Sequence, residues 1–412
     1  MSFKIVVLVL LTVAFLFDIA MDTLEYRSRN NPIPSCLEGV YDEPTYKKWK
    51  SYQAELVRLD IIFAIIAFAI NFTLLISNVY SIVANKVDPS LTMQVLIVVS
   101  LSLGVDTVVG FIKGYIANLK IEQKYGFNKM TLKTFIADQI KSLIISFVLL
   151  FGLILLLGVI YENLHDWVLL LFSGVLIVLV LAIMFLYPVF SKAFNKFTSL
   201  EEGSLRDKLT NLLTSHGYQV KDIKVMDASK RTTKSNAYFA GYGKLKTIVL
   251  YDTLIQNLSE EEIVAVFAHE LGHGLHKDTL KNSFLSFLNI VIIVLCAWLL
   301  IRFPTLYEGF GFNNVNYAFA FIVLSSSFLP ILSPLINLFT TFMSRKAEYA
   351  ADAFSVKEGH GEALISALKK LSVSNFSNLA PNKVVVKLTY SHPTLEQRIL
   401  AINKLLEEKQ NG

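Results

Sequence analysis

Two histidines and a glutamate at helical spacing are the strongest candidates for catalytic chemistry in this chain. Residues 265–276 read AVFAHELGHGLH, which places His269 and His273 four positions apart with Glu270 directly after the first. Positions i and i+4 share one face of an α-helix, so both imidazoles can reach a single metal ion. The carboxylate of Glu270 then projects toward the open coordination position, where a water would sit. The pattern predicts a zinc site of the HExxH type.

A zinc hydrolase with two histidine ligands needs a third ligand from elsewhere in the chain. Thr279 stands where a third histidine would follow in HExxHxxGxxH, so that pattern is excluded. Glu348, in SRKAEYAADAFSV, is the candidate, with Asp352 one turn later to hold a ligating histidine. The same ExxxD spacing begins at Glu38 and Glu162. The first lies in a proline-rich segment and the second in a loop predicted across the membrane, so Glu348 is favoured.

Zinc with a neighbouring glutamate predicts hydrolysis of a peptide bond, with Glu270 as the base. A donor near the developing oxyanion would add stabilisation, and YSHPTLEQRI offers His392 and Arg398. From the residues alone, His392 is more typical of a surface histidine.

The composition indicates a membrane protein. Of 412 residues, 54% are hydrophobic and only 17% are charged, whereas soluble domains carry about 25% charged residues. The net charge of +5 is small and no basic block is present, which argues against nucleic acid as a partner. Two cysteines, Cys36 and Cys296, cannot make a disulfide framework or a cysteine metal cluster.

Apolar runs predict seven membrane spans, because a helical span needs about 20 mostly apolar residues. The loops after the first and third spans are rich in Lys and Arg, which places them and the C-terminus in the cytoplasm and the N-terminus outside. The predicted spans cover residues 3–20, 61–84, 91–117, 142–161, 167–187, 284–301 and 316–341.

The spans divide the chain into four parts. Residues 1–187 hold the first five spans, 188–281 the first half of a zinc protease domain, 282–341 the last two spans, and 342–412 the second half. In the first half, the sequence pattern predicts a helix at 205–216. It also predicts a small sheet formed by β-rich runs at 222–226 and 247–251, with residues 236–242 between these runs. In the second half, the pattern predicts helices at 344–357 and 361–371. The expected fold is mainly α, with a gluzincin-like zinc protease domain on a polytopic membrane bundle.

At this point the sequence resembles the integral-membrane zinc metalloproteases of the CAAX prenyl protease 1 type. The blocks that carry the resemblance run through most of the chain: EQKYGFNK (122–129), FNKFTSLEEG (194–203), ASKRTTKSNAYFAGYG (228–243), VAVFAHELGH (264–273), SRKAEYAADAF (344–354) and YSHPTLEQR (390–398). The resemblance implies seven membrane helices around a water-filled intramembrane chamber. It also implies removal of the three residues that follow a prenylated cysteine, with a further upstream cut in some members.

The resemblance also implies roles for particular residues. Zinc would be bound by His269, His273 and Glu348, with Glu270 as general base and Asp352 behind a ligand. His392 and Arg398 would lie near the scissile carbonyl. A substrate would lie extended along an edge strand formed by Asn236, Ala237 and Tyr238, held by main-chain hydrogen bonds.

One departure from many relatives follows the second histidine. Gly274 replaces a tryptophan, and Asp278 replaces a histidine five positions after His273. The expected partners are a lipidated or membrane-associated peptide and the bilayer, in a bacterial inner membrane or the endoplasmic reticulum, with the active site on the cytoplasmic side. Two alternatives stay open: a quality-control membrane zinc protease, and a non-catalytic chambered protein that binds lipidated peptides around a structural zinc.

Overall fold

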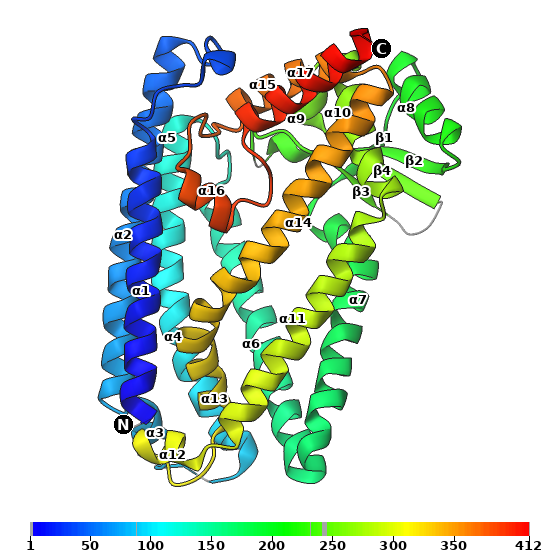
Figure 1. Cartoon of the computed structure of the whole chain (residues 1–412). Coiled ribbons are helices and arrows are strands. Elements are labelled where there is room, and N and C mark those ends of the chain that lie inside the picture. Colours follow the sequence, from blue (N-terminus) through cyan, green and yellow to red (C-terminus); the bar gives the residue numbers. More distant parts are fainter. Residues whose placement is uncertain (1–2, 88, 231, 241–244, 412) are drawn as a thin grey trace.

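Long helices occupy most of the molecule, and a small sheet with shorter helices covers one end of them (Figure 1). The computed structural model describes residues 3–87, 89–230, 232–240 and 245–411. The N-terminus lies at the end of the helical bundle away from the sheet, and the C-terminus lies at the sheet end. The chain therefore consists of a bundle of long helices and one polar end, where both halves of the predicted protease domain meet.

Six segments are long and apolar enough to cross a membrane: Phe3–Ser28, Glu43–Ile76, Leu91–Tyr125, Leu132–Met184, Asp278–Ile301 and Tyr317–Lys357. Large apolar side chains are exposed along them, among them Val9, Ile62, Ile144 and Phe284. Exposed apolar surface of this extent is suited to lipid rather than water. The chain is therefore an integral membrane protein with several spans.

The predicted fourth span, and the predicted fifth except for its last three residues, fall within the single segment Leu132–Met184. A three-residue turn, His165–Trp167, divides it into α6 (Leu132–Leu164) and α7 (Val168–Phe194), which meet at the lower end of Figure 1. The backbone of His165 has a positive φ of 44°, which lets the chain reverse there. Two helices, α6 and α7, thus share this one apolar segment, and the count of seven membrane spans stays a prediction.

The other apolar helices follow the predicted runs. They are α1 (Phe3–Ser28), α2 (Glu43–Ile76), α4 (Leu91–Ile116), α11 (Asp278–Ile301), α13 (Tyr317–Val323) and α14 (Leu329–Lys357). Short elements connect them: α3 (Val79–Ala84), α5 (Gln123–Tyr125), α12 (Pro304–Gly309), a 3-10 turn at Ser35–Leu37, and π-helical turns at Ala117–Glu122 and Leu324–Phe328.

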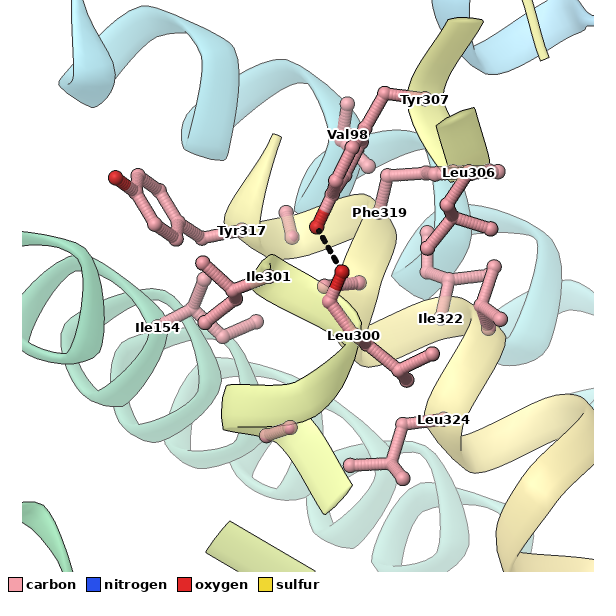
Figure 2. Close-up of a cluster of buried hydrophobic side chains, with 14 of the residues drawn as sticks. Val98, Ile154, Leu300, Ile301, Leu306, Tyr307, Tyr317, Phe319, Ile322 and Leu324 are labelled. Carbon is pink, nitrogen blue, oxygen red and sulfur yellow. Dashed lines mark hydrogen bonds between the residues drawn. The ribbon is translucent and has the colours of Figure 1, made fainter. Parts of the chain in front are cut away.

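A hydrophobic cluster joins the helices at the end far from the sheet (Figure 2). Tyr307 of α12 is almost wholly buried, and its hydroxyl donates a hydrogen bond to the carbonyl of Leu300 at 3.3 Å. Around it pack side chains from α4, α6, α11 and α13, including Val98, Ile154 and Phe319. The hydrogen bond satisfies the buried hydroxyl, and the apolar side chains of several helices pack against one another. These contacts hold this end of the bundle together.

The sheet has four strands in the order β1-β2-β4-β3. They are β1 (Phe197–Ser199), β2 (Gln219–Met226), β3 (Ala237–Ala240) and β4 (Leu245–Tyr251). β2 and β4 are parallel, and the two outer pairs are antiparallel. β3 is therefore an edge strand, and Asn236 directly precedes it. Of the predicted run 236–242, residues 241 and 242 lie outside the described residues.

Helices from both halves of the chain complete the polar end of the molecule. α8 (Ser204–Ser215), α9 (Asp252–Asn257) and α10 (Glu260–Leu275) come from the first half, together with a 3-10 turn at Ala228–Lys230. α15 (Gly361–Ser374), α16 (Lys383–Thr389) and α17 (Leu395–Asn411) come from the second. One apolar core buries Leu213, Ile248 and Phe267 and extends to Ala367. The two halves thus fold as one unit although the last membrane helices separate them in sequence.

Candidate metal centre

The helix α10 carries the HELGH segment and has a strong N-terminal cap. Ser259 accepts a hydrogen bond from the backbone N–H of Glu262, and the Glu262 carboxylate accepts one from the N–H of Ser259. This reciprocal pair is a capping box, which satisfies two backbone donors at the helix start. The same carboxylate accepts hydrogen bonds from Ser366 and Lys370 of α15. Glu262 therefore fixes both the start of α10 and its position against α15.

We expect Glu262→Gln to lower the free energy of unfolding by about 1–2 kcal/mol, because a buried carboxylate loses its charge and at least one hydrogen bond. Burial alone would raise the pKa of Glu262, but hydrogen bonds from Lys370, Ser366 and Ser259 outweigh it and lower that pKa. Its stabilising effect is present above the unfolded-state pKa of about 4.3 and is lost as the pH falls through the lower folded-state value.

Thermal unfolding in detergent measures this effect. The melting temperature of the variant should lie below that of the wild type at neutral pH, and the two should converge in acid. Glu261→Gln is the matched control, since its exposed carboxylate pairs only with Lys208 among the described residues. Equal melting temperatures for wild type and Glu262→Gln at neutral pH would contradict the role of the capping carboxylate.

A glycine in HELGH lets α10 and α14 cross closely. A Cβ at Gly272 would lie 3.0 Å from the Cα of Ala351 and 3.1 Å from the Cβ of Phe354. Both contacts are tighter than side chains normally tolerate. The hydroxyl of Ser355 also donates to the carbonyl of Ala265 across the buried crossing, at 3.1 Å. Small residues thus bring the two helices near enough for their side chains to share one ion.

Three predicted ligands converge at this crossing. His269, His273 and Glu348 each offer a ligand atom, and these atoms all lie within 4.8 Å of one another. The two Nε2 atoms are 3.2 Å apart. The Glu348 carboxylate lies 3.5 Å from Nε2 of His269 and 3.3 Å from Nε2 of His273. The Glu348 side chain is only 6% exposed. The group is compact, mostly buried and drawn from α10 and α14.

The donor set fits a divalent metal. One buried oxygen of Glu348, Oε2, has no hydrogen-bond partner among the described residues. Burial would lower the pKa of His273, yet hydrogen bonding to Glu348 and Asp278 outweighs it and raises that pKa to about 9. The site therefore stabilises positive charge. Two imidazoles and one carboxylate are the His₂Glu ligand set of catalytic zinc sites, which leave a fourth position open.

The carboxylate of Asp352 lies behind the first histidine. The Nδ1 atom of His269 lies 2.8 Å from Oδ1 of Asp352. Arg398 of α17 donates to both oxygens of that carboxylate, at 2.9 Å and 2.6 Å. A hydrogen bond at Nδ1 directs the Nε2 lone pair toward the metal position. The structure thus brings Asp352 and Arg398 together behind His269, and the guanidinium also lies 3.6 Å from Glu348.

The second histidine has a matching carboxylate that the sequence reasoning did not assign. Nδ1 of His273 lies 3.0 Å from Oδ2 of Asp278, and Lys281 donates to the other oxygen at 3.0 Å. Asp278 is buried at the start of α11. Lys277 has a left-handed backbone with φ of 57°, which turns the chain so that Asp278 faces back to α10. The only signal in the sequence was an acidic residue five positions after the histidine.

Glu270 lines a cleft of about 430 Å³ beside the metal group. Burial raises its pKa, and the charge of Glu348 acts in the same direction, while His269, His273 and Arg398 oppose the shift. Polar groups of the metal site meet apolar side chains of α10 and α15 in the lining, which is Ser235, Asn236, Ala237, Leu254, Val266, His269, Glu270, Glu348, Leu364, Leu368, Leu371, Ser372, Asn375, Ser377, His392 and Arg398. The cleft has the size of a small-ligand site.

His392 reaches the metal group from the segment between α16 and α17. Its Nε2 atom lies 3.3 Å from Oε1 of Glu348, and its Nδ1 atom lies 2.9 Å from the hydroxyl of Ser391. The imidazole is 64% exposed, so it faces the open side of the site. Arg345 of α14 fixes this segment by donating to the carbonyls of Val386 and Tyr390. His392 is thus exposed and also adjacent to the predicted ligand.

The predicted substrate-binding residues lie at the edge strand but face different ways. Asn236 and Ala237 line the cleft. Tyr238 instead packs with Met226 and Val249 in a separate small cluster. Successive strand residues point to opposite faces of a sheet, which explains the difference. The side chain of Tyr238 therefore lies away from the cleft, and only its backbone belongs to the strand edge.

Comparison with known proteins gives matches over nearly the whole chain. Residues 199–406 match peptidase family M48, and residues 22–196 match the CAAX prenyl protease N-terminal family, described as five membrane helices. The chain is 30% identical to a CAAX prenyl protease 1 homolog of Oryza sativa over 98% of both chains. It is also 30% identical to CAAX prenyl protease 1 of Saccharomyces cerevisiae, covering 92% of this chain and 90% of the yeast protein.

A solved structure shares the fold. The crystal structure of S. mikatae Ste24p matches with a TM-score of 0.90 at 27% sequence identity, over 98% of this chain and 99% of the other. The match covers the membrane helices of this chain as well as its sheet.

Proposed function

Since the chain belongs to peptidase family M48 and matches CAAX prenyl protease 1 relatives along its length, we propose that this membrane zinc metalloprotease cuts prenylated CAAX-type proteins near their C-termini. One observation carries the proposal. Two imidazoles from α10 and a buried carboxylate from α14 present their ligand atoms to one point beside a cleft.

His269, His273 and Glu348 would hold the zinc ion. When bound, zinc supplies an electrophile for the scissile carbonyl and lowers the pKa of a coordinated water toward about 7. Asp352 and Asp278 hold the two imidazoles by their Nδ1 atoms, which would leave both Nε2 atoms available to the metal. The two oriented imidazoles and the buried carboxylate pre-form the site, so little entropy is lost on binding metal.

Glu270 is the general base in this proposal. Its carboxylate lines the cleft next to His269 and Glu348, within the space where substrate and water would meet. It takes a proton from the attacking water at a carboxylate oxygen and passes that proton to the departing amine. A structural zinc site has no use for such a residue beside an open position, which disfavours the non-catalytic alternative.

His392 and Arg398 stabilise negative charge in different ways. The exposed imidazole of His392 can donate to an oxyanion on the open side of the site. Arg398 is buried and bidentate to Asp352, so it acts mainly by fixing that carboxylate and by its charge near Glu348.

The substrate backbone lies along the edge of β3 in this proposal, next to Asn236 and Ala237. An edge strand holds an extended peptide by main-chain hydrogen bonds without selecting its side chains. The four sequence parts at 1–187, 188–281, 282–341 and 342–412 would then act as membrane bundle and split protease domain. Seven spans around a chamber, with the active site on the cytoplasmic side, would receive a lipidated substrate from the bilayer.

A matched set of peptides tests the substrate. The purified protein should cut a farnesylated CAAX peptide after the prenylated cysteine, as read by the masses of both products. It should cut the same peptide without the lipid more slowly. Preference for an unfolded membrane protein over either peptide would favour the quality-control alternative and contradict the proposal.

We expect Asp278→Ala to weaken zinc binding by about 10- to 100-fold, which is the usual cost of removing the partner of a ligating histidine. Zinc dissociation constants measured by competition with a chelator provide the test. Asp222→Ala is the control, because its carboxylate pairs with Lys224 on the sheet, away from the metal group. An unchanged zinc affinity in Asp278→Ala would show that the hydrogen bond to His273 has no part in holding the ion.

A further inference from the structure

A second pocket lies between α11, which follows the two histidines in the chain, and α14, which carries Glu348. Its volume is about 320 Å³, and its lining is mostly polar but uncharged: Asn282, Leu285, Ser286, Asn289, Ile336, Asn337, Thr340, Thr341, Ser344 and Ser391. The two helices lie next to each other in Figure 1. We propose that this pocket is a subsite that binds uncharged, extended peptide backbone of the substrate next to the scissile bond.

The polar residues form one stripe on each helix. On α11, Asn282, Ser286 and Asn289 lie four and three positions apart, and Asn337 and Ser344 of α14 are separated by seven. These spacings put each set on a single helical face. Both stripes therefore face a shared space within segments that are otherwise apolar enough to span a membrane.

The carboxamides in this pocket have unused hydrogen-bonding capacity. The hydroxyls of Ser286 and Thr341 donate to carbonyls of their own helices. Among the described residues, no group hydrogen-bonds the side-chain amides of Asn282, Asn289 or Asn337. Asn282 and Asn337 are exposed and Asn289 is half-buried, so these carboxamides are open to the pocket. A polar group in a membrane-spanning helix needs water or a polar ligand as its partner, and a peptide that enters the pocket can supply that partner in place of water.

The chemistry of the lining selects the occupant. No acidic or basic side chain lines the pocket, so neither an anion nor a cation would be compensated there. A lipid chain could not satisfy the amides. A carboxamide offers both a donor and an acceptor, which matches the N–H and C=O that each peptide unit presents. An uncharged peptide segment is polar, carries no net charge, and offers both donors and acceptors to the carboxamides.

The pocket adjoins the metal group. Ser391 lines it, and its hydroxyl lies 2.9 Å from Nδ1 of His392, whose Nε2 is 3.3 Å from Glu348. Ser344 precedes Glu348 by one turn of α14. Glu348 and His392 also line the first cleft, which holds the edge strand. Both spaces therefore border the metal group, and a peptide could pass from β3 across the metal position into the second pocket.

The length of helix sets the reach of the subsite. Asn337 and Glu348 are eleven residues apart on α14, which is about 16 Å at 1.5 Å per residue. An extended peptide covers that distance with about five residues. Substrate residues up to about five positions from the scissile bond therefore lie within reach of the carboxamides.

Peptide affinity tests the subsite, which rests on the proposed function. In a Glu270→Gln background, we expect Asn289→Leu with Asn337→Leu to raise the dissociation constant of a fluorescent farnesylated CAAX peptide by about 25-fold, at about fivefold for each of two lost hydrogen bonds. Asn71→Leu is the matched control, because its amide already bonds the carbonyl of Ala67 within α2. Asn289→Ala with Asn337→Ala repeats the test with smaller side chains. Unchanged zinc content and melting temperature in each variant show that it is folded.

Truncated peptides identify which side of the scissile bond enters the pocket. Shortening the peptide on that side should abolish the difference between the leucine variant and its parent, and shortening it on the other side should preserve it. An unchanged dissociation constant in the leucine and alanine variants would overturn the subsite while leaving cleavage by the wild type intact. If the wild type fails to cut the peptide at all, the proposed function fails and the subsite fails with it.

Discussion

Glu270→Gln should keep its zinc and lose peptide cleavage by about 10³-fold, within the range that general-base catalysis supplies. The amide has nearly the shape of the carboxylate but cannot accept the proton of the attacking water. The three ligand side chains are untouched, so the metal group of α10 and α14 stays intact. The measurement is kcat on a farnesylated CAAX peptide together with zinc content by elemental analysis.

Glu261→Gln provides the comparison for this variant. It makes the same chemical change on the same helix, at an exposed carboxylate that pairs with Lys208. Its kcat should match the wild type. If Glu270→Gln retained zinc and cut the peptide within a few-fold of the wild-type rate, Glu270 would not be the base.

Glu348→Ala should abolish metal binding and activity together. It removes the third ligand and leaves two imidazole nitrogens that face each other at 3.2 Å without a carboxylate. It also leaves His392 and Arg398 without the oxygen atoms they now approach. A catalytic zinc needs three protein ligands, and this variant keeps only two of them. We therefore expect less than about 0.1 zinc per chain after dialysis.

Glu358→Ala is the control for Glu348→Ala. Glu358 caps the end of the same helix, and its carboxylate pairs with His216 outside the metal group. It should keep zinc and activity. A Glu348→Ala protein that bound zinc as tightly as the wild type would show that the third ligand lies elsewhere.

The local part of the site could be predicted from sequence because helical spacing determines it. His269 and His273 lie on one face in any regular helix, and Glu348 and Asp352 do so in another. The convergence of the two helices depended on Gly272 and Ala351, whose small size matters only once the crossing exists. The need for a third zinc ligand, and then the family resemblance, provided the expectation that these two helices meet.

Other features depend on backbone details that composition does not show. Asp278 reaches His273 through the left-handed turn at Lys277, which apolar run lengths do not reveal. The two predicted spans around His165 became one candidate segment because only three residues separate α6 from α7. Asn289 and Asn337 stand within apolar runs of the sequence, and only the packing of α11 beside α14 puts them on one pocket.

Titration of zinc into the chelated protein tests the central claim most directly. Bound zinc and cleavage of a farnesylated CAAX peptide are followed in the same samples. Cleavage should be absent after chelation, return in proportion to bound zinc, and stop rising at one zinc per chain, because one His₂Glu site carries both. Full cleavage by protein that holds less than about a tenth of an equivalent of zinc would contradict the account.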